Sequence, residues 1–153
     1  MNTIEFKKRT LKADPKRNAE SRIFYDVIVD GKSLFEQFID AESDMVGNLG
    51  FYNNVDLNLK TIDEYQLKGK SELESGQNML FVCRECGDIG CGAITVKVDQ
   101  TENGITWSNY KWENGYEESY ESDFIDFKTL EFEKNEYFKA LEIVRKNCLQ
   151  QRI

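Results

Sequence analysis

Three of the four cysteines in this chain stand close together, as Cys83, Cys86 and Cys91. A Cys-x-x-Cys-Gly sequence is typical of a zinc knuckle, in which a turn presents two thiolates and the glycine lets backbone N–H groups approach the sulfur atoms. Cys91 supplies a third thiolate from the other arm of the same turn. A structural zinc site needs four protein ligands, and because the chain contains no histidine, Cys148 is the one remaining candidate. A zinc site would therefore consist of Cys83, Cys86, Cys91 and Cys148.

Two interpretations of the same cysteines need no metal, and we adopt the first of them here. Cysteine is among the most frequently buried residue types, so Cys83 and Cys91 are expected to be small buried residues on strands and Cys86 a turn residue. The second interpretation is a redox pair. Such pairs typically lie at a helix N-terminus in a βαβ unit, whereas this motif falls between two predicted strands. We therefore expect no cofactor, with zinc as the alternative.

The absence of histidine removes most familiar catalytic chemistry. Ser-His-Asp and Cys-His nucleophile systems, His-ligated zinc, haem with a proximal histidine and a histidine general base are all excluded. The chain has 28 acidic residues, but chance supplies many carboxylate pairs at that density, and a pair alone assigns no reaction. No Asp-x-Asp-x-Asp-Gly loop for Ca²⁺ is present. We therefore expect a protein that is not an enzyme.

The charge of the chain is negative and unevenly distributed. With 20 basic and 28 acidic residues the formal net charge is −8, and the pI is about 4.7. Nucleic-acid-binding proteins concentrate positive charge on one face, so this balance argues against a nucleic-acid partner. Residues 113–136 contain nine acidic and two basic residues, a local charge of −7. Residues 1–20 carry +3, from six basic and three acidic residues.

Aromatic residues are interleaved with the acids of the segment 113–126. Tryptophan and tyrosine beside carboxylates are typical of protein interfaces, where the rings supply contact area and the acids attract a basic partner. The other interpretation is a solvated acidic loop, with Phe124 and Phe127 in the core. We expect a non-catalytic protein that binds a basic protein partner, for instance a bacterial immunity protein that neutralises a cationic toxin. The expected partner-binding residues are Trp112, Glu113, Tyr116, Glu117, Glu118, Tyr120, Glu121 and Asp123.

We call residues 83–91 the cysteine turn. The strands on either side must position it. Runs rich in β-branched and aromatic residues, joined by glycine-bearing turns such as Asn103-Gly104, cover residues 79–83, 93–98 and 105–112. These runs predict a three-stranded antiparallel meander at 79–112. The cysteine turn then lies between the first two strands of the meander.

Helices and further strands complete an expected α+β fold, a single domain over residues 1–153 with helices packed on one face of an antiparallel sheet. Asp30-Gly31 is a strong type I′ turn signal after the strand 22–29, and Ser33 is expected to cap a short helix. The C-terminal helix is predicted to start near Asn135, with Phe138, Leu141, Val144 and Cys148 on one face. The other expected segments are strands at 4–10 and 128–132, a helix at 57–67 and a loop at 41–56.

The run from Phe81 to Val96, followed by Ile105–Ser108 and Trp112–Tyr116, resembles a family of small uncharacterised bacterial proteins marked by Cys-x-x-Cys-Gly-Asp-x-Gly-Cys-Gly-Ala. The resemblance covers residues 79–117 and implies a bacterial cytosolic protein, without an activity to transfer. The N-terminus has an early acidic residue and no apolar core, so no signal peptide is expected. No stretch approaches the roughly 18 apolar residues of a membrane helix. We therefore expect a cytoplasmic protein without a membrane partner, whose thiols are kept reduced.

Overall fold

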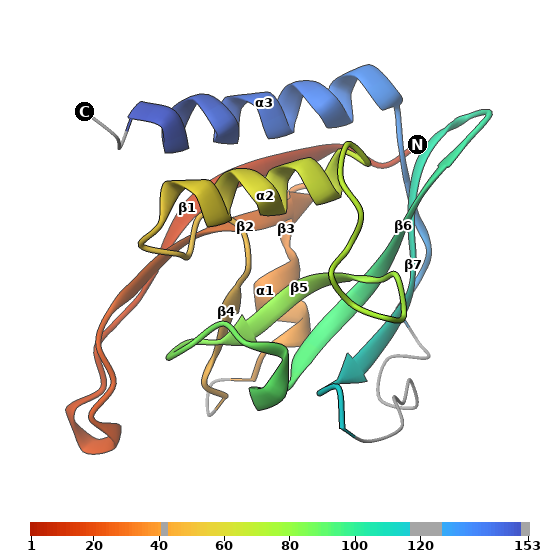
Figure 1. Cartoon of the computed structure of the whole chain (residues 1–153). Helices are drawn as coiled ribbons and strands as arrows, with labels where there is room; N and C mark the ends of the chain where they lie inside the picture. The colour runs from red at the N-terminus through yellow and green to blue at the C-terminus, as the bar shows by residue number, and fades with distance from the viewer. Residues whose placement is uncertain (41–42, 117–126, 151–153) are drawn as a thin grey trace.

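The computed structural model describes residues 1–40, 43–116 and 127–150, and these form an α+β fold with two antiparallel sheets and three α-helices (Figure 1). The expected fold class is confirmed. The strands of the first sheet, in spatial order, are β1 (Ile4–Leu11), β2 (Arg22–Val29) and β3 (Lys32–Ser33). Those of the second are β4 (Met45–Gly47), β5 (Asn78–Cys83), β6 (Ala93–Thr101), β7 (Gly104–Glu113) and β8 (Leu130–Phe132). The helices are α1 (Leu34–Phe38), α2 (Val55–Tyr65) and α3 (Lys134–Gln150), and 3₁₀ turns form at η1 (Pro15–Arg17) and η2 (Ile89–Cys91).

The predicted meander is present as strands β5, β6 and β7. β5 pairs antiparallel with β6, and β6 pairs antiparallel with β7 through a tight turn that sets Thr101 opposite Gly104. The meander continues at both ends, because β4 pairs with β5 and β8 pairs with β7. The cysteine turn connects β5 to β6, as expected.

The prediction of a loop over residues 41–56 is wrong for part of that segment. Met45–Gly47 forms strand β4, and α2 begins at Val55. A three-residue strand is too short to show the alternation of a half-buried strand, so no sequence pattern marks it. The Asn54 side chain caps α2 by accepting hydrogen bonds from two backbone N–H groups of the first turn, at 2.9 and 3.3 Å.

The C-terminal helix has its predicted apolar face but a different cap. Glu133 Oε2 accepts a hydrogen bond from the backbone N–H of Glu136 at 2.7 Å, so Glu133 caps the helix in place of Asn135. Leu141, Val144 and Cys148 are buried, and Phe138 packs against them as a partly buried residue. Within the described part of the chain, no helix has the length and apolar character needed to cross a membrane.

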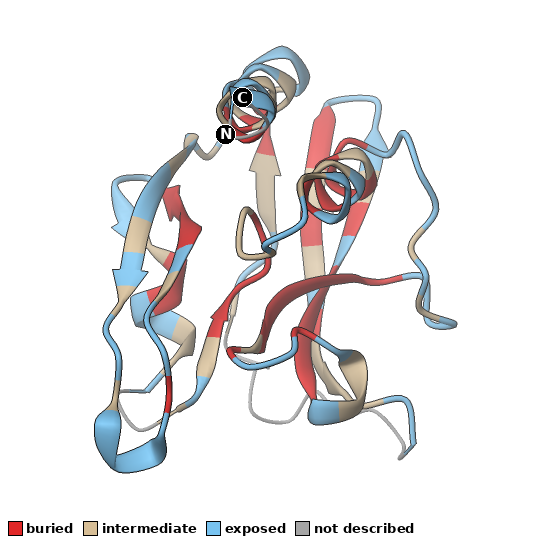
Figure 2. Ribbon diagram, turned by 60° about the vertical axis from the view of Figure 1, so that its left-hand side comes forward, coloured by how far each residue is buried: buried red, intermediate tan, exposed pale blue. Residues whose placement is uncertain are grey.

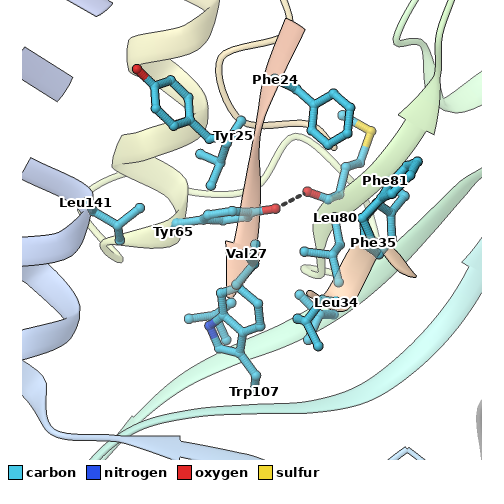
Figure 3. Packing of buried hydrophobic residues seen from close by; sticks show 14 of the residues in the cluster. Phe24, Tyr25, Val27, Leu34, Phe35, Tyr65, Leu80, Phe81, Trp107 and Leu141 are labelled. Atoms are coloured by element: carbon cyan, nitrogen blue, oxygen red, sulfur yellow. Dashed lines mark hydrogen bonds between the residues drawn. The ribbon is translucent and has the colours of Figure 1, made fainter. Parts of the chain in front are cut away.

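The core lies between the two sheets and against α2 and α3, as the buried strands and helix faces in Figure 2 show. Three of its large aromatic residues, Trp107, Tyr137 and Tyr65, have their polar side-chain atoms hydrogen-bonded. Trp107 Nε1 donates to Tyr137 Oη at 3.1 Å, and Tyr137 Oη donates to the Tyr65 carbonyl oxygen at 2.7 Å. Tyr65 Oη donates to the Met79 carbonyl oxygen at 2.5 Å (Figure 3). This chain of hydrogen bonds joins β7, α3, α2 and β5, which removes the cost of burying unpaired polar groups.

The hairpin of β1 and β2 extends away from the helices and ends in η1 (Figure 1). We call residues 8–24 of this hairpin the arm. Its tip is exposed, as the pale blue colour in Figure 2 shows. The base of the arm lies beside the cysteine turn, and residues of both line one cleft.

Candidate metal centre

The side chains of Cys83, Cys86 and Cys91 converge at the turn between β5 and β6. Cys83 ends β5, Cys86 lies in the turn and Cys91 ends η2. The three Sγ atoms all lie within 4.8 Å of one another, and those of Cys86 and Cys91 are 3.2 Å apart. Sulfur ligands of a tetrahedral zinc ion lie about 3.8 Å apart, because the Zn–S bond is about 2.3 Å long. Small rotations of the side chains therefore suffice to bring all three sulfurs to one metal ion.

Backbone N–H groups of the turn point at the sulfur atoms. Asp88 N donates to Cys86 Sγ at 3.4 Å, and the turn is closed by Gly87 N donating to the Cys83 carbonyl oxygen at 2.9 Å. Burial alone would raise the pKa of Cys83, but hydrogen bonds from the backbone of Cys86 and Glu85 outweigh it and hold that pKa below its usual value. The backbone of the turn thus stabilises a thiolate at Cys83, which is the form that binds metals.

Cys91 shows the opposite shift. Its hydrogen bond to Cys86, together with the negative charge on Cys83 and Cys86, raises the pKa of Cys91 to about 12. Three thiolates at these distances repel each other strongly when no cation lies between them. A divalent cation at their centre would remove that repulsion and favour the ionised form of all three.

Gly87 allows the turn to pack against the loop that precedes α2. Its φ is +66°, a conformation that side chains disfavour. A Cβ atom at this position would lie 2.8 Å from the Tyr52 ring and 2.9 Å from the Phe51 ring. The glycine of the Cys-x-x-Cys-Gly motif therefore has a packing role here besides the approach of N–H groups to sulfur.

Two arginines fasten the cysteine turn to the arm. The Arg84 side chain is buried, with 4% of its surface exposed, and donates to the carbonyl oxygens of Lys12, at 3.0 Å, and Glu20. In return, Arg22 Nε donates to the Arg84 carbonyl oxygen at 2.7 Å. Neither residue was predicted from the sequence, because contacts between distant segments produce no regular spacing of residues. The charged residue directly after the apolar run of β5 was the one sequence feature that indicated Arg84.

Cys148 does not join the other three cysteines. Its side chain is fully buried in the core on α3, a helix that packs against α2, β1 and β7. The cluster of possible metal ligands contains Cys83, Cys86 and Cys91, and no fourth ligand among the described residues lies within the same 4.8 Å. The four-cysteine set therefore fails at its fourth member, because the face of α3 that carries Cys148 is turned to the core.

The expectation that Cys83 and Cys91 are simple buried strand residues also needs correction. Cys86 and Cys91 are exposed, and Cys83 is half-buried. Cys91 lies in η2 and not on a strand, since β6 begins at Ala93. Burial therefore does not account for three thiols held together at the surface.

The expected partner-binding residues are only partly within the described chain. Trp112 packs over Gly92, where an added Cβ would overlap the indole ring, and Glu113 Oε2 accepts from the hydroxyls of Ser75, at 3.1 Å, and Thr95, at 2.5 Å. Both side chains thus serve the fold. Tyr116 is 84% exposed, and its hydroxyl lies beside η2. The positions outside the described residues are Glu117, Glu118, Tyr120, Glu121 and Asp123.

Comparisons with known proteins leave the chain without a relative that could assign a function. No family model matches the chain, no curated protein matches it and no solved structure matches it. The resemblance carried by the cysteine motif therefore stays a prediction. The geometry of the cysteine turn is therefore the basis on which a function can be proposed.

Proposed function

We propose that this protein is a non-catalytic zinc-binding protein, in which Cys83, Cys86 and Cys91 hold the ion and the ion fixes a binding hairpin. The observation that carries the proposal is the convergence of the three Sγ atoms within 4.8 Å. Thiolates select soft metals, and Zn²⁺ imposes no geometry of its own, so it accepts three thiolates and a fourth ligand from elsewhere. The N–H groups directed at Cys83 and Cys86 support the same assignment, because they stabilise the thiolate form.

Elemental analysis of protein purified without a metal-affinity tag tests the proposal. The wild-type chain should contain about one zinc per molecule, because cysteine zinc sites bind tightly. Cys86→Ser and Cys91→Ser should reduce that content at least fivefold. Cys148→Ala is the matched control, since Cys148 lies in the core, and it should keep its zinc. A wild-type content below about 0.2 zinc per chain, or copper or iron in its place, would contradict the proposal.

A second candidate function is the one that the acidic segment suggests, the binding of a basic protein such as a cationic toxin. The observation that favours it is the exposed ring of Tyr116, which stands at the start of this segment. Exposed tyrosines are common anchors in interfaces, and neighbouring carboxylates steer basic partners. Under this function the chain acts as an immunity protein in the cytoplasm, and carboxylates after Tyr116 pair with lysines and arginines of the toxin.

Co-expression with the product of the adjacent gene, followed by pull-down, tests the second candidate. Association should be fast and should weaken as salt is raised. Reversing the charges of Glu117, Glu118 and Glu121 should abolish protection against the toxin. Reversing Glu102, an exposed acid in the turn between β6 and β7, is the control for a charge reversal outside the acidic segment. Unchanged protection in the triple variant would refute this function.

A further inference from the structure

A cleft of about 600 Å³ lies directly beside the cysteine turn. This volume is within the range of small-molecule sites, about 300–1,000 Å³. Residues of the arm, of the loop before α2 and of the cysteine turn form its walls, among them Lys8, Arg22, Phe51, Tyr52, Glu85 and Cys86. The cleft therefore shares a cysteine with the proposed metal site.

The wall between the cleft and the metal site is held rigidly. The Tyr52 hydroxyl lies within hydrogen-bond distance of two acceptors, the Gly87 carbonyl oxygen at 3.1 Å and Asn48 Oδ1 at 2.8 Å. On the other side, Arg22 Nε holds the Arg84 carbonyl oxygen, and its guanidinium lies 3.8 Å from the Glu85 carboxylate. The turn that carries Cys86 is thus fixed at both ends by residues that line the cleft. Fixed walls reduce the entropy lost when a ligand binds.

Of the three cysteines, Cys86 lines the cleft. Cys86 and Cys91 are both exposed, and within the described ranges three protein ligands converge. A zinc ion with three protein ligands keeps one coordination position for an outside molecule. A ligand lying in the cleft and extending past Cys86 is well placed to take that position.

The side chains of the cleft define the chemistry of such a ligand. Lys8 offers an exposed ammonium group, which suits a carboxylate. Glu20 and Glu85 pair with Arg22 at 3.2 and 3.8 Å, but their carboxylates are largely exposed and can also accept from an amino group. A zinc ion held by three thiolates can take a fourth thiolate, as in sites with four cysteines. The matching molecule carries a thiol, a carboxylate and an amino group together.

We propose that the cleft binds a low-molecular-weight amino-acid thiol, such as cysteine or a short cysteinyl peptide, whose sulfur completes the coordination of the metal. This inference rests on the zinc site proposed above. On binding, the thiol loses its proton to solvent and a metal–sulfur bond forms, in place of a metal–water bond. No electrons are transferred, so the step needs no oxidant or reductant.

Anaerobic titrations of the Co²⁺-loaded protein test this inference, because thiolate-to-cobalt bands report the number of sulfur ligands. Added cysteine should change these bands at a concentration at least tenfold below that needed for 2-mercaptoethanol, which lacks the charged groups. Alanine, which lacks the thiol, should leave the bands unchanged. Lys8→Ala should raise the cysteine concentration required by about tenfold and leave the response to 2-mercaptoethanol as it was. Ultrafiltration should show that the cobalt stays with the protein throughout.

The outcomes separate this inference from the proposed function. If no thiolate-to-cobalt bands appear before any thiol is added, the metal site itself is wrong. If the bands appear but cysteine acts no better than 2-mercaptoethanol, or if Lys8→Ala has no effect, the metal site stands and the thiol cleft is refuted. Removal of cobalt from the protein by cysteine would also refute it.

Discussion

Gly92 stands at the base of the cysteine turn, and its lack of a side chain decides how the turn meets the sheet. Its φ is +93°, and an added Cβ would overlap the Trp112 ring. We expect Gly92→Ala to lower the free energy of unfolding by about 3 kcal/mol, through overpacking and backbone strain. Urea denaturation measures the change. Gly69→Ala is the control, because a Cβ there makes an ordinary contact at 3.9 Å, and its cost should stay below about 0.5 kcal/mol.

Glu64 on α2 should make stability depend on pH. Burial and the nearby carboxylate of Glu72 raise the pKa of Glu64 to about 7, against a smaller lowering effect of the Lys60 ammonium group. The folded protein then holds this proton more tightly than the unfolded chain, so the contribution is full below about pH 4.5 and is lost as the pH rises to 7. The free energy of unfolding should fall by about 2–3 kcal/mol over that range.

Glu64→Gln should remove this contribution to the pH dependence, because the amide does not titrate. Chemical denaturation at pH 5 and pH 8 gives the comparison, and the variant should be the more stable protein at pH 8. Glu102→Gln, at an exposed turn, should follow the wild-type pH profile. If Glu64→Gln follows the same profile as Glu102→Gln, the burial of Glu64 carries no such cost.

At the scale of elements, the joint between the arm and the cysteine turn depends on Arg84. Its buried guanidinium donates to carbonyl oxygens of Lys12, directly after β1, and Glu20, shortly before β2. Arg84→Met keeps most of the apolar packing but leaves these carbonyl groups without a donor. We expect a loss of about 2–3 kcal/mol and faster amide hydrogen exchange in residues 12–20. Arg17→Met removes largely exposed ion pairs with Asp14 and Asp44 at the tip, so it should change stability by less than about 1 kcal/mol. If amide hydrogen exchange in the arm is the same in Arg84→Met as in the wild type, other contacts hold the arm against the cysteine turn.

The sequence predicted the helices and strands that have a strong local sequence pattern. The meander has long β-rich runs and an Asn103-Gly104 turn, and the structure has these strands as β5, β6 and β7. Strand β4 is too short for a periodic pattern, so it was missed. The clustering of Cys83, Cys86 and Cys91 belonged to the zinc alternative, whereas the interpretation adopted from the sequence was of buried thiols, and the structure brings the three side chains together. The position of Cys148 depends on how α3 packs. A helical period predicts which residues share one face of a helix, but it does not predict which element that face packs against.

The cleft could not be predicted from the sequence either, because Lys8, Tyr52 and Cys86, which line it, are far apart in the chain. The arm, the loop before α2 and the cysteine turn each have recognisable local sequences. Their meeting is a product of tertiary packing, which no local pattern encodes. A sequence can therefore indicate a turn rich in cysteine without predicting what lies next to it.

At the scale of the whole molecule, a bound metal should stabilise the complete fold. The ligands come from the end of β5 and from η2, and the turn between them is fastened to the arm through Arg84 and to the loop before α2 through Tyr52. Opening the site therefore disturbs contacts in both sheets. A ligand that binds the folded state alone at a free concentration 1,000 times its dissociation constant adds about 4 kcal/mol of stability. For a domain of this size, that corresponds to a rise in Tm of about 10 °C.

Thermal unfolding in buffered zinc and in chelator measures this coupling. The wild-type Tm should be about 10 °C higher in zinc than in chelator. Cys91→Ser, which removes one ligand at an exposed position, should lose most of that difference while its Tm in chelator stays near the wild-type value. Cys148→Ala should have a lower Tm in both conditions, because it leaves a cavity in the core, and should keep the full difference. An equal zinc effect in all three proteins would place the metal somewhere other than the cysteine turn, since only one of them lacks a ligand there.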